Sequence, residues 1–341
     1  MPRAMQRTVS IAPVSHRLKA PFRISRGVKT AAEVVVVEVV EGELIGRGES
    51  VPYARYDETV DSVIAQLQPA AQALRDGATP HEAVALLTAG AARNALDCAL
   101  WDLRAKREGL SVEALTALRV PDSLVTAVTV SLDSPEAMAA AALAVASAPL
   151  IKVKLSAEDP TARLLAVAKA APHARLIVDP NEGWDFAILD GLKPVLSDLN
   201  IALVEQPLPA DADAALEGYD PPYVICADES VHTADDLAAL KGRYRAVNLK
   251  LDKAGGLTEA LLMLEEARNH GFELMVGCMV ASSLAIAPAL HLASSCAFAD
   301  LDGPWWLARD HPGGCRVADG RMTAPKPGFW GDGVTATGLW L

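Results

Sequence analysis

The first third of the chain alternates between apolar and polar positions and then changes to helical periodicity. Residues 7–50 contain Val-rich runs such as AEVVVVEVV, and this pattern predicts a small antiparallel sheet. Helical patterns follow over residues 57–76, in TPHEAVALL, which opens with a capping box, and in ARNALDCALWDLRAKREG, which ends at Gly109. We therefore predict an N-terminal α+β domain over residues 1–122.

From about residue 124, eight short β-rich runs alternate with Ala- and Leu-rich segments of helical period. The runs are VTAVTVSL, LIKVKLS, RLIVDPN, IALVEQP, YVICADES, AVNLKLDK, FELMVGC and FADLDGP. Such alternation is typical of a parallel sheet covered by helices, and eight units fit a closed barrel. We predict an α/β barrel domain over residues 123–303. The Gly/Pro/Trp-rich segment 304–341 is expected to pack back on the N-terminal domain.

The composition indicates a globular protein and argues against nucleic-acid-binding and membrane-spanning classes. The chain has 341 residues, of which 51% are apolar, so it can bury a large core. Its net charge of −12 argues against a nucleic-acid partner, and its apolar runs are too short for a membrane span. Five cysteines without CxxC spacing indicate reduced thiols, so we expect a cytoplasmic protein.

Ionisable residues end each predicted strand from the second to the sixth. They are Lys154, Asp179, Glu205, Asp228 and Lys250. Singly, each acid has an ordinary explanation, as a turn residue before proline, a loop residue or a helix N-cap. Because the carboxyl ends of barrel strands meet at one face, their recurrence in five successive units favours a ring of charges around one pocket.

The three carboxylates of this ring predict a metal site. Asp179, Glu205 and Asp228 cannot all stay ionised at one point without a cation. Oxygen ligands that leave room for water and substrate favour Mg²⁺, and the lack of His or Cys at the strand ends disfavours zinc. Strand alternation is expected to turn the neighbouring Glu229 away from the metal.

The lysines predict proton transfer. Alternation turns Lys152 and Lys154 into the barrel lumen, and Lys250 lies on the opposite wall of an eight-stranded ring. Burial beside positive charge is expected to lower a lysine pKa until the amine can act as a base, and the metal stabilises the enediolate of a carboxylate substrate. A base on each face predicts epimerisation or racemisation by Lys154 and Lys250, with Lys152 as the neighbouring charge.

The motifs of the chain resemble one known family along nearly its whole length. ARNALDCALWDLRAK, KVK, VDPNEGW, VEQPL, ADES and NLKLDKAGGLTEA resemble the enolase superfamily, in its muconate-lactonizing-enzyme subgroup. The resemblance implies a (β/α)7β TIM-like barrel with an α+β capping domain that the C-terminal tail completes. It also implies that the carboxylate triad binds Mg²⁺ and that Lys154 and Lys250 are the acid/base pair.

Within this subgroup the sequence is most similar to the dipeptide epimerases. DLDG resembles the acidic pair that holds the free ammonium group of a dipeptide, which implies this role for Asp300 and Asp302. The alternative is that one of them caps a strand or pairs with Lys250. PFRISRG resembles a capping loop whose arginine meets an acidic substrate side chain; Arg26 matches that position, with Arg23 as a nearby alternative.

The expected function is epimerisation of a dipeptide such as L-Ala-L-Glu or L-Ala-D-Glu. The same machinery would serve an N-acylamino acid racemase, an o-succinylbenzoate synthase or a cycloisomerase. A Schiff-base lyase and a binding protein without catalysis are further alternatives. The expected partner is a small molecule, and association with further copies of the chain stays open.

Overall fold

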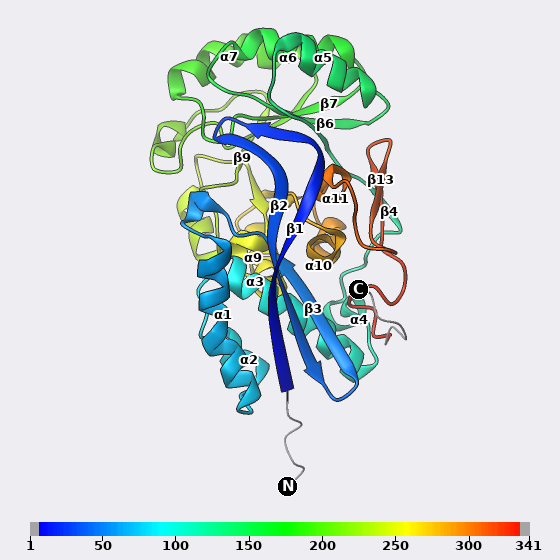
Figure 1. Cartoon of the computed structure of the whole chain (residues 1–341). Helices are drawn as coiled ribbons and strands as arrows, with labels where there is room; N and C mark the ends of the chain where they lie inside the picture. Colours follow the sequence, from blue (N-terminus) through cyan, green and yellow to red (C-terminus); the bar gives the residue numbers. More distant parts are fainter. Residues whose placement is uncertain (1–6, 335–341) are drawn as a thin grey trace.

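The computed structural model describes residues 7–334 (Figure 1). An antiparallel sheet of order β1-β2-β3 is formed by β1 (Arg7–Ile24), β2 (Gly27–Glu41) and β3 (Leu44–Ser50). The register pairs Val14 with Val34, and it shifts between Arg17 and Phe22. The tip of the β1–β2 hairpin, coloured blue in Figure 1, reaches up toward the barrel strands.

Helices complete the capping domain, and the two longest of them pack against this sheet. The helices are the 3₁₀ helix η1 (Ala54–Tyr56), α1 (Val60–Arg75), α2 (Pro80–Val84), α3 (Ala91–Glu108) and α4 (Val112–Thr116). The predicted capping box at Thr79 begins α2, and Gly109 ends α3 with φ of 64°. A Cβ added at Gly46 or Gly48 would overlap the backbone of α3, so glycine permits this close packing.

Eight parallel strands form the predicted barrel in sequence order. They are β5 (Val128–Val130), β6 (Leu150–Lys154), β7 (Arg175–Asp179), β8 (Ile201–Glu205), β9 (Val224–Ala227), β10 (Ala246–Leu249), β11 (Glu273–Gly277) and β12 (Phe298–Asp300). The amide of Ala127 donates to the carbonyl of Ala299 at 2.8 Å and links the first strand to the last. The (β/α)7β architecture expected from the sequence is confirmed.

The outer layer of the barrel is less regular than the sequence suggested. Its helices are α5 (Pro135–Ala144), α6 (Pro160–Ala170), α7 (Phe186–Asp198), α8 (Leu251–Ala254), α9 (Leu257–Asn269) and α10 (Ser283–Ala293). Only 3₁₀ helices, η2 (Asp213–Leu216) and η3 (Ala234–Leu240), follow β8 and β9. The segment PLPADADAALEGYDPP after β8 is rich in proline, which removes backbone donors and limits a helix.

The last part of the chain contacts both domains. It forms α11 (Gly303–Trp306) and the strands β13 (Arg316–Ala318) and β14 (Arg321–Thr323), which pair with each other, and β14 also pairs with β4 (Ser123–Val125). Leu307 bridges to Leu18 of β1, and the Trp330 indole donates to the carbonyl of Arg47 at 2.8 Å. The predicted C-terminal segment, 304–341, extends beyond residue 334, so its end lies outside the described residues.

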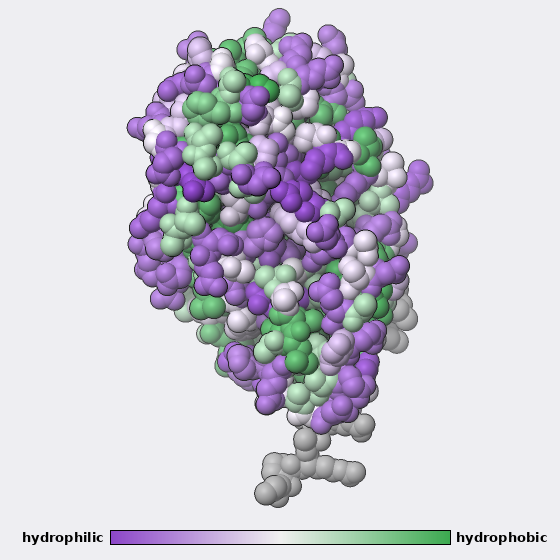
Figure 2. Space-filling model, turned by 90° about the vertical axis from the view of Figure 1, so that its left-hand side faces the viewer, coloured by the Kyte–Doolittle hydropathy of each residue, from purple (hydrophilic) through white to green (hydrophobic). Residues whose placement is uncertain are grey.

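The surface is mainly polar on the face shown in Figure 2, where hydrophilic residues surround smaller apolar groups. Within residues 7–334, no helix combines the length and the apolar character needed to cross a membrane. The barrel lumen is closed on one side by apolar side chains, among them Leu150, Ile177, Met275 and Phe298. Buried charged side chains of the described residues gather toward the opposite end of the lumen, where the strands finish.

Candidate functional site

A cavity of about 450 Å³ lies between the carboxyl ends of the barrel strands and the capping domain. Its outer wall is formed by the tip of the β1–β2 hairpin and by η1. Among the residues expected at the site, those that line the cavity are Arg26, Lys152, Lys154, Asp228, Lys250, Asp300 and Asp302. Asp179 and Glu205 are fully buried beside this cavity, in contact with its lysines.

The carboxylates of Asp179, Glu205 and Asp228 end three adjacent strands and are held together by lysines. The Nζ atom of Lys152 lies 3.0 Å from Asp179 and 2.7 Å from Glu205. Lys250 Nζ lies 2.6 Å from Asp228 and 3.8 Å from Glu205. Burial and the nearby Asp179 raise the pKa of Glu205 to about 7.

Lys154 and Lys250 lie on opposite walls of the barrel. Lys154 ends β6 and Lys250 directly follows β10, four strands away in either direction around the ring. Lys154 Nζ is 2.6 Å from Asp179, and Lys250 Nζ is 2.6 Å from Asp228. Both line the cavity, so a carbon atom held between them can exchange protons with either side.

The carboxylates of the ring raise the pKa values of two buried lysines. Burial alone would lower the pKa of Lys152 and Lys250, but the surrounding carboxylates outweigh it and hold both values well above the usual range. In this arrangement the ammonium groups are themselves the counter-charges of the acidic ring.

Two residues that support the ring were missed by the sequence reasoning. Lys253 is buried and donates to Asp228 Oδ1 at 2.6 Å and to the carbonyl of Asn248 at 3.2 Å. The side-chain amide of Asn248 donates to Glu205 Oε1 at 2.9 Å. Alternation from Lys250 could have placed Asn248 in the lumen, whereas Lys253 reaches Asp228 from helix α8.

Asp300, which ends β12, and Asp302, two residues later, have different partners. Asp300 Oδ2 lies 2.7 Å from Lys152, so its partner is this lysine and not Lys250. Asp302 Oδ2 accepts from the amide of Thr129 at 2.7 Å and from the Trp306 indole at 3.3 Å. Burial and the charge of Asp300 raise the pKa of Asp302 to about 6.

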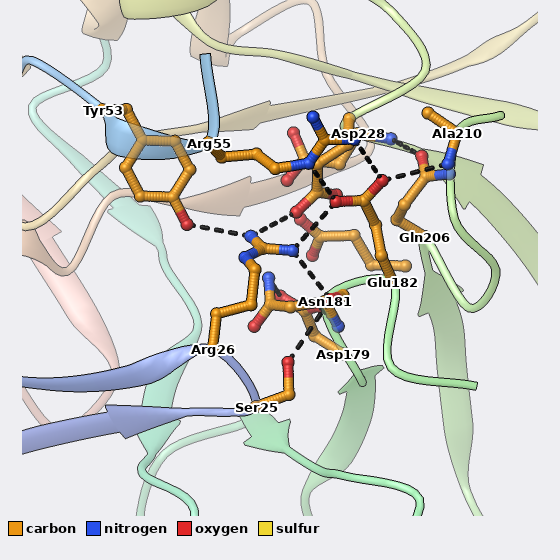
Figure 3. Close-up of polar contacts among 12 residues, drawn as sticks. Ser25, Arg26, Tyr53, Arg55, Asp179, Asn181, Glu182, Gln206, Ala210 and Asp228 are labelled. Atoms are coloured by element: carbon orange, nitrogen blue, oxygen red, sulfur yellow. Dashed lines mark hydrogen bonds and ion pairs between the residues drawn. The ribbon is translucent and has the colours of Figure 1, made fainter. Parts of the chain in front are cut away.

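Arg26 is held at the hairpin tip by a network of acceptors (Figure 3). Its guanidinium donates to the carbonyl of Asn181 at 2.7 Å, to the Tyr53 hydroxyl at 2.8 Å and to Glu229 at 2.7 Å. Glu182 lies 3.0 Å from it. Glu229 thus pairs with Arg26 at the cavity wall and not with the carboxylate ring.

Two other basic residues of the β1–β2 hairpin have different surroundings. Arg23, the alternative to Arg26, donates to Asp133 at 2.9 Å, and it does not line the cavity. Lys29, which the sequence reasoning missed, lines the cavity 5.1 Å from the centre of the Tyr53 ring. Among residues 7–334, no carboxylate lies within ion-pair distance of Lys29, and Asp252 attracts its charge only from farther away.

Family models match both parts of the chain. Residues 6–116 match the mandelate racemase / muconate lactonizing enzyme N-terminal domain, and residues 136–335 match the enolase C-terminal domain-like family. The chain is 50% identical to L-Ala-D/L-Glu epimerase of Escherichia coli K12, over 89% of this chain and 95% of that one. It is 45% identical to N-acetyl-D-glutamate racemase of a Pseudoalteromonas species, over 87% and 95% of the two chains.

Solved structures agree with these matches. An enolase family member of Agrobacterium tumefaciens, with bound sodium and L-Ala-L-Glu, is 45% identical and superposes with a TM-score of 0.92 over 95% of this chain and 100% of that one. A dipeptide epimerase of Enterococcus faecalis, complexed with Mg and L-Leu-L-Tyr, is 28% identical with a TM-score of 0.89 over 96% and 99% of the chains. The chain therefore belongs to the mandelate racemase / muconate lactonizing enzyme family of the enolase superfamily.

Proposed function

We propose that the chain is a dipeptide epimerase that inverts the α-carbon of glutamate in L-Ala-D/L-Glu. The observation that carries the proposal is the placement of Lys154 and Lys250 on opposite walls of one cavity, each 2.6 Å from a buried carboxylate. The relatives of known activity support the same reaction, because they include an L-Ala-D/L-Glu epimerase that is 50% identical. The protein is accordingly an isomerase.

The residues of the site fit a divalent cation. Asp179, Glu205 and Asp228 present buried carboxylate oxygens from adjacent strands, and Lys152, 2.7 Å from Glu205 Oε2, supplies the positive charge beside them. A donor set of oxygens suits Mg²⁺. These three residues would hold the ion, which supplies positive charge for the negative charge that develops on the substrate carboxylate.

Proton transfer falls to the two facing lysines. One of them, as a neutral amine, removes the α-proton, and the other, as an ammonium group, delivers a proton to the opposite face. Their ion pairs with Asp179 and Asp228 must loosen first, because a paired ammonium group is a poor base. Lys152 contributes charge beside Lys154, and Lys253 and Asn248 keep the ring carboxylates oriented.

The cavity has groups for both ends of such a dipeptide. Its volume of about 450 Å³ is in the range of small-molecule pockets. Asp302, at one end, offers a carboxylate to the substrate ammonium group, with Asp300 beside it. Arg26 and Lys29, in the β1–β2 hairpin, offer positive charge to the glutamate side chain.

An N-acetylglutamate racemase is the second candidate. The relative named for N-acetyl-D-glutamate is 45% identical, and Asp300 is already paired with Lys152 at 2.7 Å, which leaves Asp302 as the free acid for an ammonium group. An N-acetyl substrate carries no ammonium group and needs neither acid. The choice between the two substrates therefore depends on Asp302.

Proton exchange with solvent tests the proposal. The protein is incubated with Mg²⁺ in D₂O with L-Ala-L-Glu or with N-acetyl-L-glutamate, and NMR follows deuterium at the glutamate α-carbon. We expect rapid exchange and inversion of the dipeptide and slow exchange of the N-acetyl compound. Exchange of neither compound would refute both candidates, and preferential exchange of N-acetyl-L-glutamate would select the second.

We also infer a cytoplasmic location. All five cysteines are free thiols, and three of them, Cys98, Cys226 and Cys315, are buried. Reduced cysteines are typical of the cytosol. Fractionation of the native host, with detection of the chain in the soluble cytoplasmic fraction, is the measurement that checks this inference.

A further inference from the structure

A second cluster of metal-binding side chains lies outside the cavity, where three parts of the chain meet. It consists of His16 on β1, Glu49 on β3 and His311, which follows α11. One ligand atom of each residue lies within 4.8 Å of those of the other two. None of the three residues lines the cavity described above.

The sheet register explains why two of these residues meet. His16 on β1 pairs with Ala32 of the middle strand β2, and Glu49 on β3 pairs with Val36 of the same middle strand. Ala32 and Val36 are an even number of residues apart, so His16 and Glu49 project from the same face of the capping sheet. This face packs against the segment after β12, because Leu18 and Ala32 are in one buried cluster with Trp306 and Leu307. His311 is brought to the same interface by that segment.

The histidine nitrogens that face this cluster have no hydrogen-bond partner at normal length, and Glu49 attracts His16 from farther away. Nε2 of His16 and Nε2 of His311 are both buried, and neither forms a hydrogen bond to any residue in 7–334. The nearest acid oxygen, Glu49 Oε2, lies 3.7 Å from His16 Nε2, beyond normal hydrogen-bond length. Buried polar atoms without partners are uncommon in folded proteins, so these two nitrogens require an explanation.

The residues around His16, Glu49 and His311 orient these side chains as residues around a metal site do. Glu49 is held by Ser282, whose amide donates to Oε1 at 2.8 Å and whose hydroxyl donates to Oε2 at 2.6 Å. Such second contacts orient ligating carboxylates while leaving lone pairs free. The carboxylates of Glu33 and Asp310 add negative charge near His16, and Arg47 is the opposing positive group near His311.

We propose that His16, Glu49 and His311 form a binding site for a transition-metal ion of the zinc class, separate from the carboxylate ring. Two imidazole nitrogens and one carboxylate oxygen are the ligands that such ions prefer, whereas Mg²⁺ prefers oxygen alone. The chain then sorts two metals between two sites by ligand chemistry. The bound ion clamps β1 and β3 of the capping sheet to the C-terminal segment.

The ligand atoms of His16, Glu49 and His311 must move closer together to bind one ion. Ligand atoms around tetrahedral zinc lie about 3.3 Å apart, since each metal–ligand bond is about 2.0 Å. The present separations of up to 4.8 Å therefore have to shorten. His311 lies in residues 310–315, which form no helix or strand, so the contraction would not require a helix or strand to shift there.

Calorimetric titration with Zn²⁺ tests the site in the full chain, with excess Mg²⁺ present to occupy the carboxylate ring. We expect the wild type to bind one Zn²⁺ ion, and we expect His16→Gln and His311→Gln each to weaken this binding at least tenfold. His173→Gln, which changes an exposed histidine, is the matched control and should bind like the wild type. Asp228→Asn, in the ring, should retain the same binding step.

Thermal unfolding of the same proteins gives a second readout. Zn²⁺ should raise the Tm of the wild type and of His173→Gln but not that of His16→Gln or His311→Gln, because an ion that binds only the folded state stabilises it. Absence of Zn²⁺ binding by the wild type would overturn the proposal. Unchanged binding in both histidine variants, or loss of binding in Asp228→Asn, would also overturn it, since the ion would then lie elsewhere.

Discussion

Lys29 and Arg26 line the same cavity, but they differ in whether nearby carboxylates offset their positive charge. Arg26 was the cation expected to meet the substrate, yet Glu182 and Glu229 lie within 3.0 Å of it and offset its charge. Lys29 has no such partner among the described residues and faces the same cavity. Lys29 therefore offers an acidic substrate side chain a positive charge that no carboxylate offsets at ion-pair distance.

Replacement of Lys29 by methionine should impair turnover of acidic dipeptides selectively. We expect kcat/KM for L-Ala-L-Glu to fall about tenfold, the value of one charge-assisted contact, whereas L-Ala-L-Gln should change little. Steady-state kinetics with both dipeptides measures this difference. Lys241→Met, which removes an exposed lysine outside the cavity, should leave both values unchanged. Equal losses for the two dipeptides would show that Lys29 is not selective for charge.

Asp302 makes substrate binding dependent on pH. Burial and the neighbouring Asp300 raise its pKa to about 6, so the carboxyl group is neutral below that pH and charged above it. Only the charged form pairs with an ammonium group, and kcat/KM for the dipeptide should therefore rise as the pH increases through about 6. The pH profile of Asp302→Asn should lack this rise. An identical rise in the variant would assign it to another group.

At the scale of elements, strand alternation predicted most of the site and failed beyond the strand ends. Five of the expected site residues belong to strands or directly follow them, so the two-residue period of a strand determines which way their side chains point. They are Lys152, Lys154, Asp179, Glu205 and Asp228. Lys253, by contrast, reaches Asp228 from a short helix whose orientation the sequence pattern does not determine.

The sequence pattern also could not predict the contacts of the capping loops or the 3₁₀ helices of the barrel. The contacts of Arg26 join residues up to 203 positions apart, and such long-range pairs leave no local signal. The 3₁₀ helices η2 and η3 were expected only as segments of helical period. The roles assigned to the site residues stay predictions until the variants described here are measured.

The close packing of α3 on β3 predicts how glycine substitutions change the free energy of unfolding. A methyl group at Gly48 would overlap the backbone of α3 at Ala95, so Gly48→Ala should lower the free energy of unfolding by about 3 kcal/mol. Gly191 lies within α7 with no atom near its added Cβ, and Gly191→Ala should instead stabilise the protein by up to about 1 kcal/mol. Chemical denaturation measures both. Equal effects would contradict the packing argument.

At the scale of the whole molecule, barrel closure creates the functional geometry. Lys154 and Lys250 are 96 residues apart in the sequence numbering, and only an eight-stranded ring places β6 and β10 on opposite walls. The capping hairpin then covers this end of the ring and supplies Arg26 and Lys29 to the cavity. Neither domain contains the complete cavity by itself.

The central claim is that two lysines act on opposite faces of one carbon atom. It is tested most directly by Lys154→Ala and Lys250→Ala, each incubated with Mg²⁺ in D₂O with L-Ala-L-Glu and, separately, with L-Ala-D-Glu. We predict that each variant loses inversion but still exchanges the α-proton of one epimer, and that the two variants exchange opposite epimers. Exchange of the same epimer by both variants, or continued inversion by either, would contradict the account.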